Sequence, residues 1–267
     1  MWNEDHEAAE RFLRHYQSPR GLVRIQLVAR HVTEHLPPGP AHLVDIGAGG
    51  GQQAAALARE GHRVTLVEPS PLMLARAEET IAGLPEEVRG RMSLHRMSAQ
   101  EAADRLPAAG YDGVLCHGVL MYLPSPGPLL RSLAQLCAPG GLVSVVTKNA
   151  AALAFRPALQ GDYAEALNGF GARTSTGWLG APTRGDTVED LTVGLREYGV
   201  CVRDWYGVGV FSDHRTDLED LPDDQLRLLQ AVEYEAARRD PYRATARLIH
   251  VVGHRPSARS DPPALPG

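Results

Sequence analysis

A glycine-rich turn near residue 50 constrains the fold of this 267-residue chain more than any other feature. The turn comprises residues 44–52, with the sequence VDIGAGGGQ, and it joins an apolar run to a helical pattern. Glycine adopts backbone dihedrals that other residues disfavour, and it lets a ligand approach the main chain closely. A glycine pattern alone is weak, but between a strand and a helix it predicts a nucleotide-binding turn.

Strands and helices alternate on both sides of this turn. Five strands are predicted at 41–46, 63–68, 92–96, 112–116 and 142–147, separated by helices at about 52–60, 71–81 and 128–137. Two more strands are expected at 201–211 and 248–254, with helices at 187–199 and about 222–239. Alternation of this kind predicts an α/β fold with a doubly wound, seven-stranded, mostly parallel sheet.

We expect one domain over residues 1–254, beginning with an extension of two helices in residues 1–40. Residues 149–185 interrupt the alternation and are rich in Ala, Gly, Thr and Pro. An insertion after the fifth strand lies over the carboxyl edge of the sheet, where ligands bind, so it is predicted to be a lid or a substrate-recognition segment. The tail, residues 255–267, holds four prolines and no apolar run, which predicts disorder.

Composition excludes several functional classes. The formal net charge of -5, from 27 basic and 32 acidic residues, gives no global basic field, although a local basic face remains open. Three cysteines without a CxxC spacing argue against a zinc site, and no metal is expected. No apolar run approaches the roughly 20 residues of a membrane span, and the N-terminus lacks a signal-peptide pattern. We therefore expect a cytoplasmic protein without a membrane partner.

The spacing of the glycine turn indicates an adenosine ligand that lacks a pyrophosphate. The pattern is G-x-G-x-G, whereas G-x-G-x-x-G seats a pyrophosphate against a helix. Glu68 ends the second strand, where its carboxylate can accept hydrogen bonds from both hydroxyls of a ribose. S-adenosyl-L-methionine fits these features best, and a nicotinamide-dependent dehydrogenase is a weaker alternative.

Side chains after the third and fourth strands agree with this ligand. Gln100 carries both a donor and an acceptor for the edge of an adenine. His117 and Tyr122 follow the fourth strand, beside the expected sulfonium, at the edge where such folds bind ligands. A single histidine can equally be structural, so His117 is a candidate contact at this point.

These motifs resemble those of the class I S-adenosylmethionine-dependent methyltransferases, and the chain looks most like the bacterial tRNA 5-carboxymethoxyuridine methyltransferase family. That family esterifies a carboxylate on a modified wobble uridine of the anticodon. The resemblance runs from about Arg11 to Pro256. Besides the general motifs of class I enzymes, it rests on Gly21-x-x-Arg24, Gly51-Gln52, Ala99-Gln100, His117, and the segments 207–211 and 240–251.

The resemblance implies a Rossmann-like fold and a set of residues around the cofactor. Arg24 would bind the carboxylate of the methionine moiety, a role that suits a planar guanidinium. The residues implied to line the cofactor are Arg24, Gly47, Ala48, Glu68, Ala99, Gln100 and His117. We further predict contacts from Asp45, Gly49 and Gly51 in the glycine turn, and from Pro69 and Met73 after the second strand.

The chain departs from the tRNA enzymes in its charge. Residues 166–185 contain only Arg173 and Arg184, where that family carries a lysine-rich stretch, and Gly209 stands in place of an arginine. Both changes remove positive charge, and phosphate contacts supply much of the affinity for RNA. Glu68 also replaces an aspartate.

Methyl transfer requires in-line alignment of the reacting atoms more than proton chemistry. A carboxylate acceptor is ionised at pH 7 and needs an orienting arginine or tyrosine, with no general base. Tyr122 and Arg247 are the preferred catalytic residues, and His117 or His214 is the candidate base for a hydroxyl or amine acceptor. The full set of acceptor-side candidates is Tyr122, Lys148, Asn149, Arg156, Tyr206, His214, Arg215 and Arg247.

Three hypotheses follow for the function. The first is methylation of a carboxylate on a tRNA anticodon arm, and a positive patch around Arg156, Arg215 and Arg247 would favour it. The second is methylation of a small-molecule metabolite, which an apolar closed pocket beneath residues 149–185 would favour. The third is a regulatory protein that binds the cofactor without catalysis. The sequence does not indicate an oligomeric state.

Overall fold

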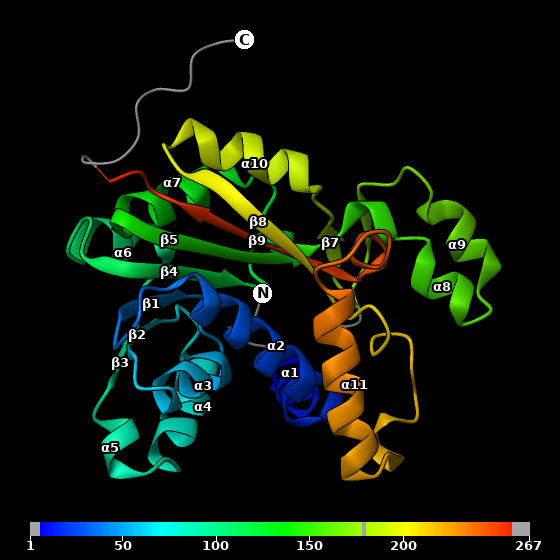
Figure 1. The fold of residues 1–267 in the computed structure, drawn as a ribbon, viewed down its shortest axis with the longest axis horizontal. Helices are drawn as coiled ribbons and strands as arrows, with labels where there is room; N and C mark the ends of the chain where they lie inside the picture. The colour runs from blue at the N-terminus through cyan, green and yellow to red at the C-terminus, as the bar shows by residue number, and fades with distance from the viewer. Residues whose placement is uncertain (1–5, 178–179, 258–267) are drawn as a thin grey trace.

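The computed structural model describes residues 6–177 and 180–257, and a seven-stranded sheet lies at its centre (Figure 1). The strand order is β3-β2-β1-β4-β5-β9-β8. The first five strands pair in parallel, and β9 runs antiparallel to both of its neighbours. The strands are β1 (His42–Ile46), β2 (Arg63–Val67), β3 (Met92–His95), β4 (Tyr111–His117), β5 (Cys137–Lys148), β8 (Cys201–Val208) and β9 (Leu248–His254). The predicted doubly wound, mostly parallel sheet is confirmed.

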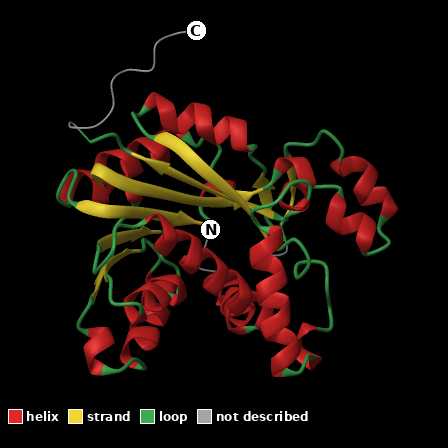
Figure 2. Cartoon of the chain, viewed as in Figure 1, coloured by secondary structure: helices red, strands yellow, loops and turns green. Residues whose placement is uncertain are grey.

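Helices cover both faces of the sheet (Figure 2). One face carries α1 (His6–Gln17), α2 (Pro19–His35), α3 (Gln52–Arg59), α4 (Pro71–Ala82), α5 (Glu86–Arg89) and α11 (Asp223–Ala236). The other face carries α6 (Ala99–Arg105), α7 (Gly127–Leu136) and α10 (Val188–Glu197). A separate cluster of buried apolar side chains fills each of the two layers. Burial of these side chains is the main source of stability and fixes the strand ends that form the site.

The glycine turn has the close packing that its sequence predicts. Gly47 follows β1 with φ 75°, and a Cβ at this position would lie 2.4 Å from Cγ2 of Val119. Val119 belongs to the loop after β4. The turn after β1 and the loop after β4 therefore meet without room for another side chain, and together they form one wall of the site.

The two N-terminal helices meet at a sharp corner. Ser18 caps α2 by accepting a hydrogen bond from the backbone N–H of Gly21, and Pro19 occupies the first turn. A Cβ at Gly21 would lie 2.2 Å from the backbone oxygen of His15, so a larger residue would force the helices apart. The predicted break between two helices is confirmed, and it brings side chains of both helices to the carboxyl edge of the sheet.

Residues 149–185 lie beyond the carboxyl end of β5 (Figure 1). They form α8 (Phe155–Leu159), α9 (Tyr163–Gly169) and a two-stranded antiparallel sheet of β6 (Thr174–Thr176) and β7 (Pro182–Arg184). The hydroxyl of Thr147 donates a hydrogen bond to Asp186, which ties the end of this segment back to the sheet. Its role as a lid stays a prediction.

Several details of the sequence prediction were wrong. The fifth strand begins at Cys137 and not at residue 142, and the short helix α5 was not predicted. Strand β8 ends at Val208 and not at residue 211, because the backbone N–H groups of Val210, Phe211 and Ser212 all donate to the buried carboxylate of Glu233. Helix α6 was not predicted, although Ser98 and Glu101 form a capping box at its start.

Residues 258–267 of the expected disordered tail lie outside the described residues. Within the described part of the chain, no helix is both long and apolar enough to cross a membrane. In the same residues, His, Cys, Asp and Glu side chains form no cluster that could hold a metal ion.

Candidate active site

A cavity of about 480 Å³ lies at the carboxyl ends of β1, β2 and β4. Its lining is mainly apolar, and Phe12 of α1 contributes to it. The predicted residues that line it are Gly47, Gly49, Glu68, Pro69, Met73, Ala99, Gln100, His117 and Tyr122. Segments that are distant in the sequence thus come together around one space, as expected for a ligand that touches several strand ends.

A second cavity of about 30 Å³ adjoins the same turn. Arg24, Asp45 and Ala48 line it together with Gly47 and His117. The structure therefore brings all but one of the predicted cofactor residues to these two cavities. The exception is Gly51, which lies at the N-terminus of α3 with φ 79° and packs near Leu66 and Ala77.

Glu68 is buried, and backbone groups hold its carboxylate in place. One oxygen accepts a hydrogen bond from the N–H of Gly49 and the other from the N–H of Ser70, each at 2.9 Å. Burial raises the pKa of Glu68, and the two N–H donors oppose that shift. A carboxylate has about four lone-pair sites, so each oxygen retains one for a ligand hydroxyl.

Asp45 is a second buried carboxyl beside the small cavity. Burial, and then the nearby charge of Glu68, raise the pKa of Asp45 to about 7. A cationic group in this cavity would favour the ionised carboxylate. Arg24 on the same cavity wall supplies a guanidinium for a ligand carboxylate.

These features fit S-adenosylmethionine. The carboxylate of Glu68 suits ribose hydroxyls, the apolar walls suit an adenine, and Arg24 with Asp45 offers opposite charges for an amino-acid end. Nδ1 of His117 is buried and has no hydrogen-bond partner among the described residues, so the cavity wall contains a polar atom that a ligand can satisfy.

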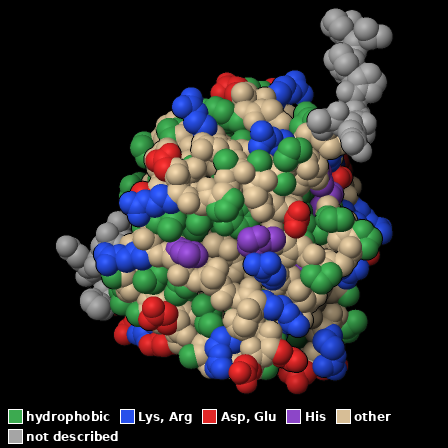
Figure 3. Space-filling model, turned by 90° about the vertical axis from the view of Figure 1, so that its left-hand side faces the viewer, with side chains coloured by type: hydrophobic (Ala, Val, Ile, Leu, Met, Phe, Trp, Pro, Cys, Tyr) green, Lys and Arg blue, Asp and Glu red, His purple; other side chains and the backbone are tan. Residues whose placement is uncertain are grey.

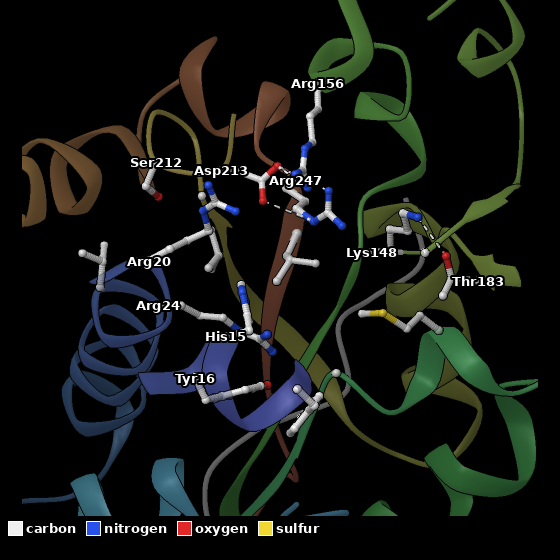
Figure 4. A pocket seen from close by; sticks show the side chains of 18 of the residues that line it. His15, Tyr16, Arg20, Arg24, Lys148, Arg156, Thr183, Ser212, Asp213 and Arg247 are labelled. Carbon is white, nitrogen blue, oxygen red and sulfur yellow. Dashed lines mark hydrogen bonds and ion pairs between the residues drawn. The ribbon is translucent and has the colours of Figure 1, made fainter. Parts of the chain in front are cut away.

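A third cavity has a volume of about 250 Å³, and Figure 4 shows side chains that line it. Phe12, Gly118 and Tyr122 line both this cavity and the first. Its chemistry is different because five of the residues that line it carry cationic side chains. Apart from Arg24, those cations are Arg20, Lys148, Arg156 and Arg247, and Asp213 is the one acidic side chain among the lining residues. Tyr122 lies where the two cavities meet, and burial raises its pKa to about 12, so its hydroxyl remains protonated.

Asp213 joins two of these arginines. Its carboxylate lies 3.3 Å from both Nε and Nη1 of Arg247, and 3.4 Å from Nη1 of Arg156 (Figure 4). Arg156 comes from α8 in the insertion and Arg247 from the residue before β9. One carboxylate cannot neutralise two guanidinium groups, so the cavity keeps an excess of positive charge.

Lys148, at the end of β5, connects the cavity to the insertion. Its ammonium donates hydrogen bonds to the hydroxyls of Ser175 in β6 and Thr183 in β7. Burial, and then the charges of Arg247 and Arg156, lower the pKa of Lys148 to about 8. This cation is therefore the one in the cavity whose charge changes within a moderate pH range.

A fourth cavity, of about 270 Å³, adjoins the third and is lined largely by residues of the 149–185 segment. It shares Lys148, Arg156, Asp213 and Arg247 with the third cavity and adds Asn149 and His214. The amide of Asn149 is already used, because it donates to the backbone oxygens of Ala244 and Ala246.

Two predicted acceptor-side residues lie elsewhere. Tyr206 packs against α2, where its ring stacks on His31 and its hydroxyl contacts Nε2 of His35 at 2.7 Å. The side chain of Arg215 points to the surface and pairs with Asp217. Tyr206 was misassigned because alternation along β8 does not reveal which helix covers each face.

The sequence analysis missed three residues of this region. Arg20 lies in the helix break that the sequence did reveal, and its guanidinium reaches the backbone oxygen of Arg215 across the cavity wall. Asp213 and Glu233 gave no local signal, because their roles depend on contacts with residues far away in the chain.

Comparisons with known proteins agree with this geometry. Residues 44–143 match the family model described as "Methyltransferase domain". The chain is 27% identical over 257 residues to the tRNA 5-carboxymethoxyuridine methyltransferase of Escherichia coli (strain K12), which covers 95% of this chain and 96% of that protein. It is 34% identical over 110 residues to the ubiquinone biosynthesis O-methyltransferase of Sodalis glossinidius (strain morsitans), which covers 40% and 41% of the two chains.

Among solved structures, the fold resembles a Burkholderia thailandensis 1,6-didemethyltoxoflavin-N1-methyltransferase with bound 1,6-didemethyltoxoflavin and S-adenosylhomocysteine. The TM-score is 0.55 and the identity 18%, over 93% of this chain and 87% of that one. The matched domain, the sheet topology and the cavity at its carboxyl edge lead to one conclusion. The protein is an S-adenosylmethionine-dependent methyltransferase with the class I fold.

Proposed function

We propose that the protein transfers a methyl group to a carboxylate on a modified wobble uridine in the anticodon arm of tRNA, which would place it in the cytoplasm. The observation that carries this proposal is the cationic cavity that opens beside the cofactor cavity. Arg247 and Arg156 can bind an acceptor carboxylate through paired N–H donors. The similarity to the tRNA enzyme over nearly the full length of both chains supports the choice of acceptor.

Five of the predicted cofactor residues have a proposed role. Arg24 binds the carboxylate of the methionine moiety and Glu68 accepts hydrogen bonds from the ribose. Gln100 reads the adenine edge, while Gly47 and Gly49 let the backbone lie close to the ligand. S-adenosylmethionine, when bound, supplies an electrophilic methyl group at a sulfonium. The insertion, residues 149–185, acts as the substrate segment and closes the site against water.

The residues on the acceptor side then have to align the acceptor carboxylate, and they do not have to remove a proton from it. Arg247, with Arg156 and Lys148, orients the acceptor carboxylate, and the hydroxyl of Tyr122 borders the passage between the two cavities. Because a carboxylate is ionised at pH 7, His117 has no proton to remove. Burial also holds the pKa of His117 well below its usual range, so the ring stays neutral.

A small anionic metabolite is the second candidate acceptor. On the face shown in Figure 3, arginine and acidic side chains are interspersed and form no continuous basic surface. Several exposed arginines elsewhere are paired with acids, among them Arg173 with Asp190 and Arg239 with Glu235. Five cationic side chains gather inside a cavity of about 250 Å³, and this enclosed charge favours a small acid over a long phosphate backbone.

A methyl-transfer assay distinguishes the two acceptors. The purified protein and labelled S-adenosylmethionine are incubated with bulk tRNA from cells that lack this protein, and in parallel with a panel of small carboxylic acids. We expect base-labile label at an anticodon uridine of the tRNA. Tight binding of S-adenosylhomocysteine with label in small acids alone would replace the tRNA acceptor by a metabolite. Absence of cofactor binding would overturn the proposed placement of the cofactor itself.

A further inference from the structure

Three histidines and a serine form a buried chain of contacts. The chain starts at the cofactor cavity and runs along one face of the sheet, over β4, β5 and β9, to α2. Nε2 of His117 lies 2.8 Å from Oγ of Ser144, and that Oγ lies 2.7 Å from Nε2 of His250. Nδ1 of His250 in turn lies 3.3 Å from Nδ1 of His31. Ser144, His250 and His31 are all completely buried.

The register of the strands explains this arrangement. His117 of β4 is opposite Val146 of β5, and Val146 is opposite His250 of β9. Ser144 lies two residues before Val146 and therefore faces the same side of the sheet. That side is covered by α2, which contributes His31. The positions of the four side chains are thus fixed by the strand register and by the packing of α2 on the sheet.

The number of protons in this chain is fixed. Burial lowers the pKa of His31 to about 2 and of His250 to about 3, and it lowers the pKa of His117 well below its usual range, so all three rings are neutral. Three neutral imidazoles and one hydroxyl carry four protons, and the three contacts use one each. The fourth proton must lie at one of the two ends, Nδ1 of His117 or Nε2 of His31.

Both end atoms are buried and have no hydrogen-bond partner among the described residues. The protonation of one end therefore decides the other, because the donors along the chain all point in the same direction. If Nδ1 of His117 carries a lone pair, then Nε2 of His31 carries the proton. If Nδ1 of His117 is protonated, Nε2 of His31 carries a lone pair and no proton.

The charges near His117 select between these two states. The guanidinium of Arg24 lies near the start of the chain, where it disfavours positive charge on both His117 and His250. Nη2 of Arg24 lies 3.1 Å from the position that a Cβ on Gly118 would occupy. Arg24 and His117 line the same small cavity, and the positive field of Arg24 favours a lone pair over an N–H dipole on the unpaired Nδ1 of His117.

We propose that Ser144 and His250 are positioning residues that hold His117 in the Nε2–H tautomer, so that its Nδ1 lone pair faces the cationic part of the cofactor. The tautomer of a histidine is set by the partner of its other nitrogen, and here that partner is itself fixed by two further rings. The inference rests on the cofactor placement proposed above. It also predicts an alternation, with Nε2–H on His117, Nδ1–H on His250 and Nε2–H on His31.

The test is long-range 1H–15N NMR of the full-length protein with labelled histidine, because the two tautomers give different cross-peak patterns. Histidine-to-glutamine variants assign the three rings. We expect Nδ1–H on His250 and Nε2–H on the other two, with and without S-adenosylhomocysteine. The opposite alternation, with Nδ1–H on His117, would overturn the proposal.

Two variants test the role of the chain in binding. Ser144→Ala removes the hydroxyl that links His117 to His250. We expect this variant to bind S-adenosylhomocysteine roughly threefold to tenfold more weakly in calorimetry. We also expect both tautomers of His117 to be populated. Thr65→Val is the matched control, since it removes a buried strand hydroxyl that contacts His42 at 3.3 Å, away from both cofactor cavities. We expect this control to leave affinity and the His117 pattern unchanged.

An unaltered His117 pattern or unaltered affinity in Ser144→Ala would refute the positioning role. The wild-type titration separates this result from the proposed function. A wild-type protein that does not bind S-adenosylhomocysteine contradicts the cofactor placement, whereas binding with the wrong alternation contradicts the inference alone.

Discussion

The two halves of the active site are built in opposite ways. The cofactor half is mainly apolar, and backbone N–H groups of Gly49 and Ser70 hold its carboxylate, Glu68. The other half, which we propose binds the acceptor and call the acceptor half, contains several cationic side chains, and its charged groups meet through their side chains, as in the pairing of Arg156, Asp213 and Arg247. The first half is shaped for one bound conformation of one ligand. In the second half, the positions of the charged groups depend on the packing of several segments of the chain.

The largest expected effect comes from removing a cation of the acceptor half. Arg247→Ala should lower kcat/KM for the acceptor roughly 100-fold to 1,000-fold, because it removes an orienting fork and leaves Asp213 with one fewer partner. The affinity for S-adenosylhomocysteine, measured by calorimetry, should stay at the wild-type value. Arg215→Ala, which removes an exposed arginine paired with Asp217, is the control and should be active. Equal losses in both variants would show that the two halves are not separable in this way.

The corresponding change in the cofactor half is Glu68→Gln. An amide replaces a carboxylate that accepts two backbone N–H groups, so we expect the dissociation constant for S-adenosylhomocysteine to rise roughly tenfold to 100-fold. At saturating cofactor the KM for the acceptor should change little. The exposed Glu87→Gln on α5 serves as the control. An increase confined to the acceptor KM would contradict the division into two halves.

A smaller effect is expected from Glu233→Gln, which acts on the acceptor half from a distance. The buried carboxylate accepts hydrogen bonds from Val210, Phe211 and Ser212 and so shapes the loop that presents Asp213. An amide nitrogen cannot accept these bonds, and we expect kcat/KM to fall roughly threefold to tenfold, together with a loss of about 2 kcal/mol in the free energy of unfolding. Glu235→Gln, on the exposed side of the same helix, should leave both quantities unchanged. Urea unfolding and steady-state kinetics measure the two effects.

The smallest effect is a pH dependence from Lys148. Burial and neighbouring arginines lower its pKa to about 8, so its charge is present below that pH and is lost as the pH rises above it. The binding of an anionic acceptor should therefore weaken on the alkaline side of pH 8, by roughly fivefold for the loss of one cation among the five in the cavity. Lys148→Met should have a lower kcat/KM without that alkaline decline. An alkaline decline that persists in Lys148→Met would assign it to another group.

The cofactor half could be predicted from the sequence because it is local. Each strand end contributes a short motif, and the rule that ligands bind at the carboxyl edge of a parallel sheet brings the motifs together. Gly51 shows the limit of this reasoning. Its positive φ is needed where the chain enters α3, and the residue lines neither cofactor cavity. A glycine pattern identifies the turn but not the function of each glycine in it.

The acceptor half was predicted in part. Arg247 and Tyr122 lie at strand ends or in the resembling segment, and the structure places both at the acceptor cavity. Asp213 could not be predicted, because its importance comes from arginines 57 and 34 residues away in the chain, at positions 156 and 247. Pairings over such distances follow from tertiary packing, and one sequence does not contain them in any local pattern.

The contacts of Glu233 have a consequence for how acceptor preference can diversify. The carboxylate binds the loop at residues 210–212 mainly through backbone N–H groups, and the hydroxyl of Ser212 is the one side chain that it also binds. Backbone donors are common to every residue except proline. The hydrogen bonds to Glu233 therefore do not depend on the side chain at position 211, whereas Val210 is held by its burial in a small apolar cluster. Substitution of the partly buried Phe211 can thus alter the loop that presents Asp213 while the backbone contacts that shape the loop are retained.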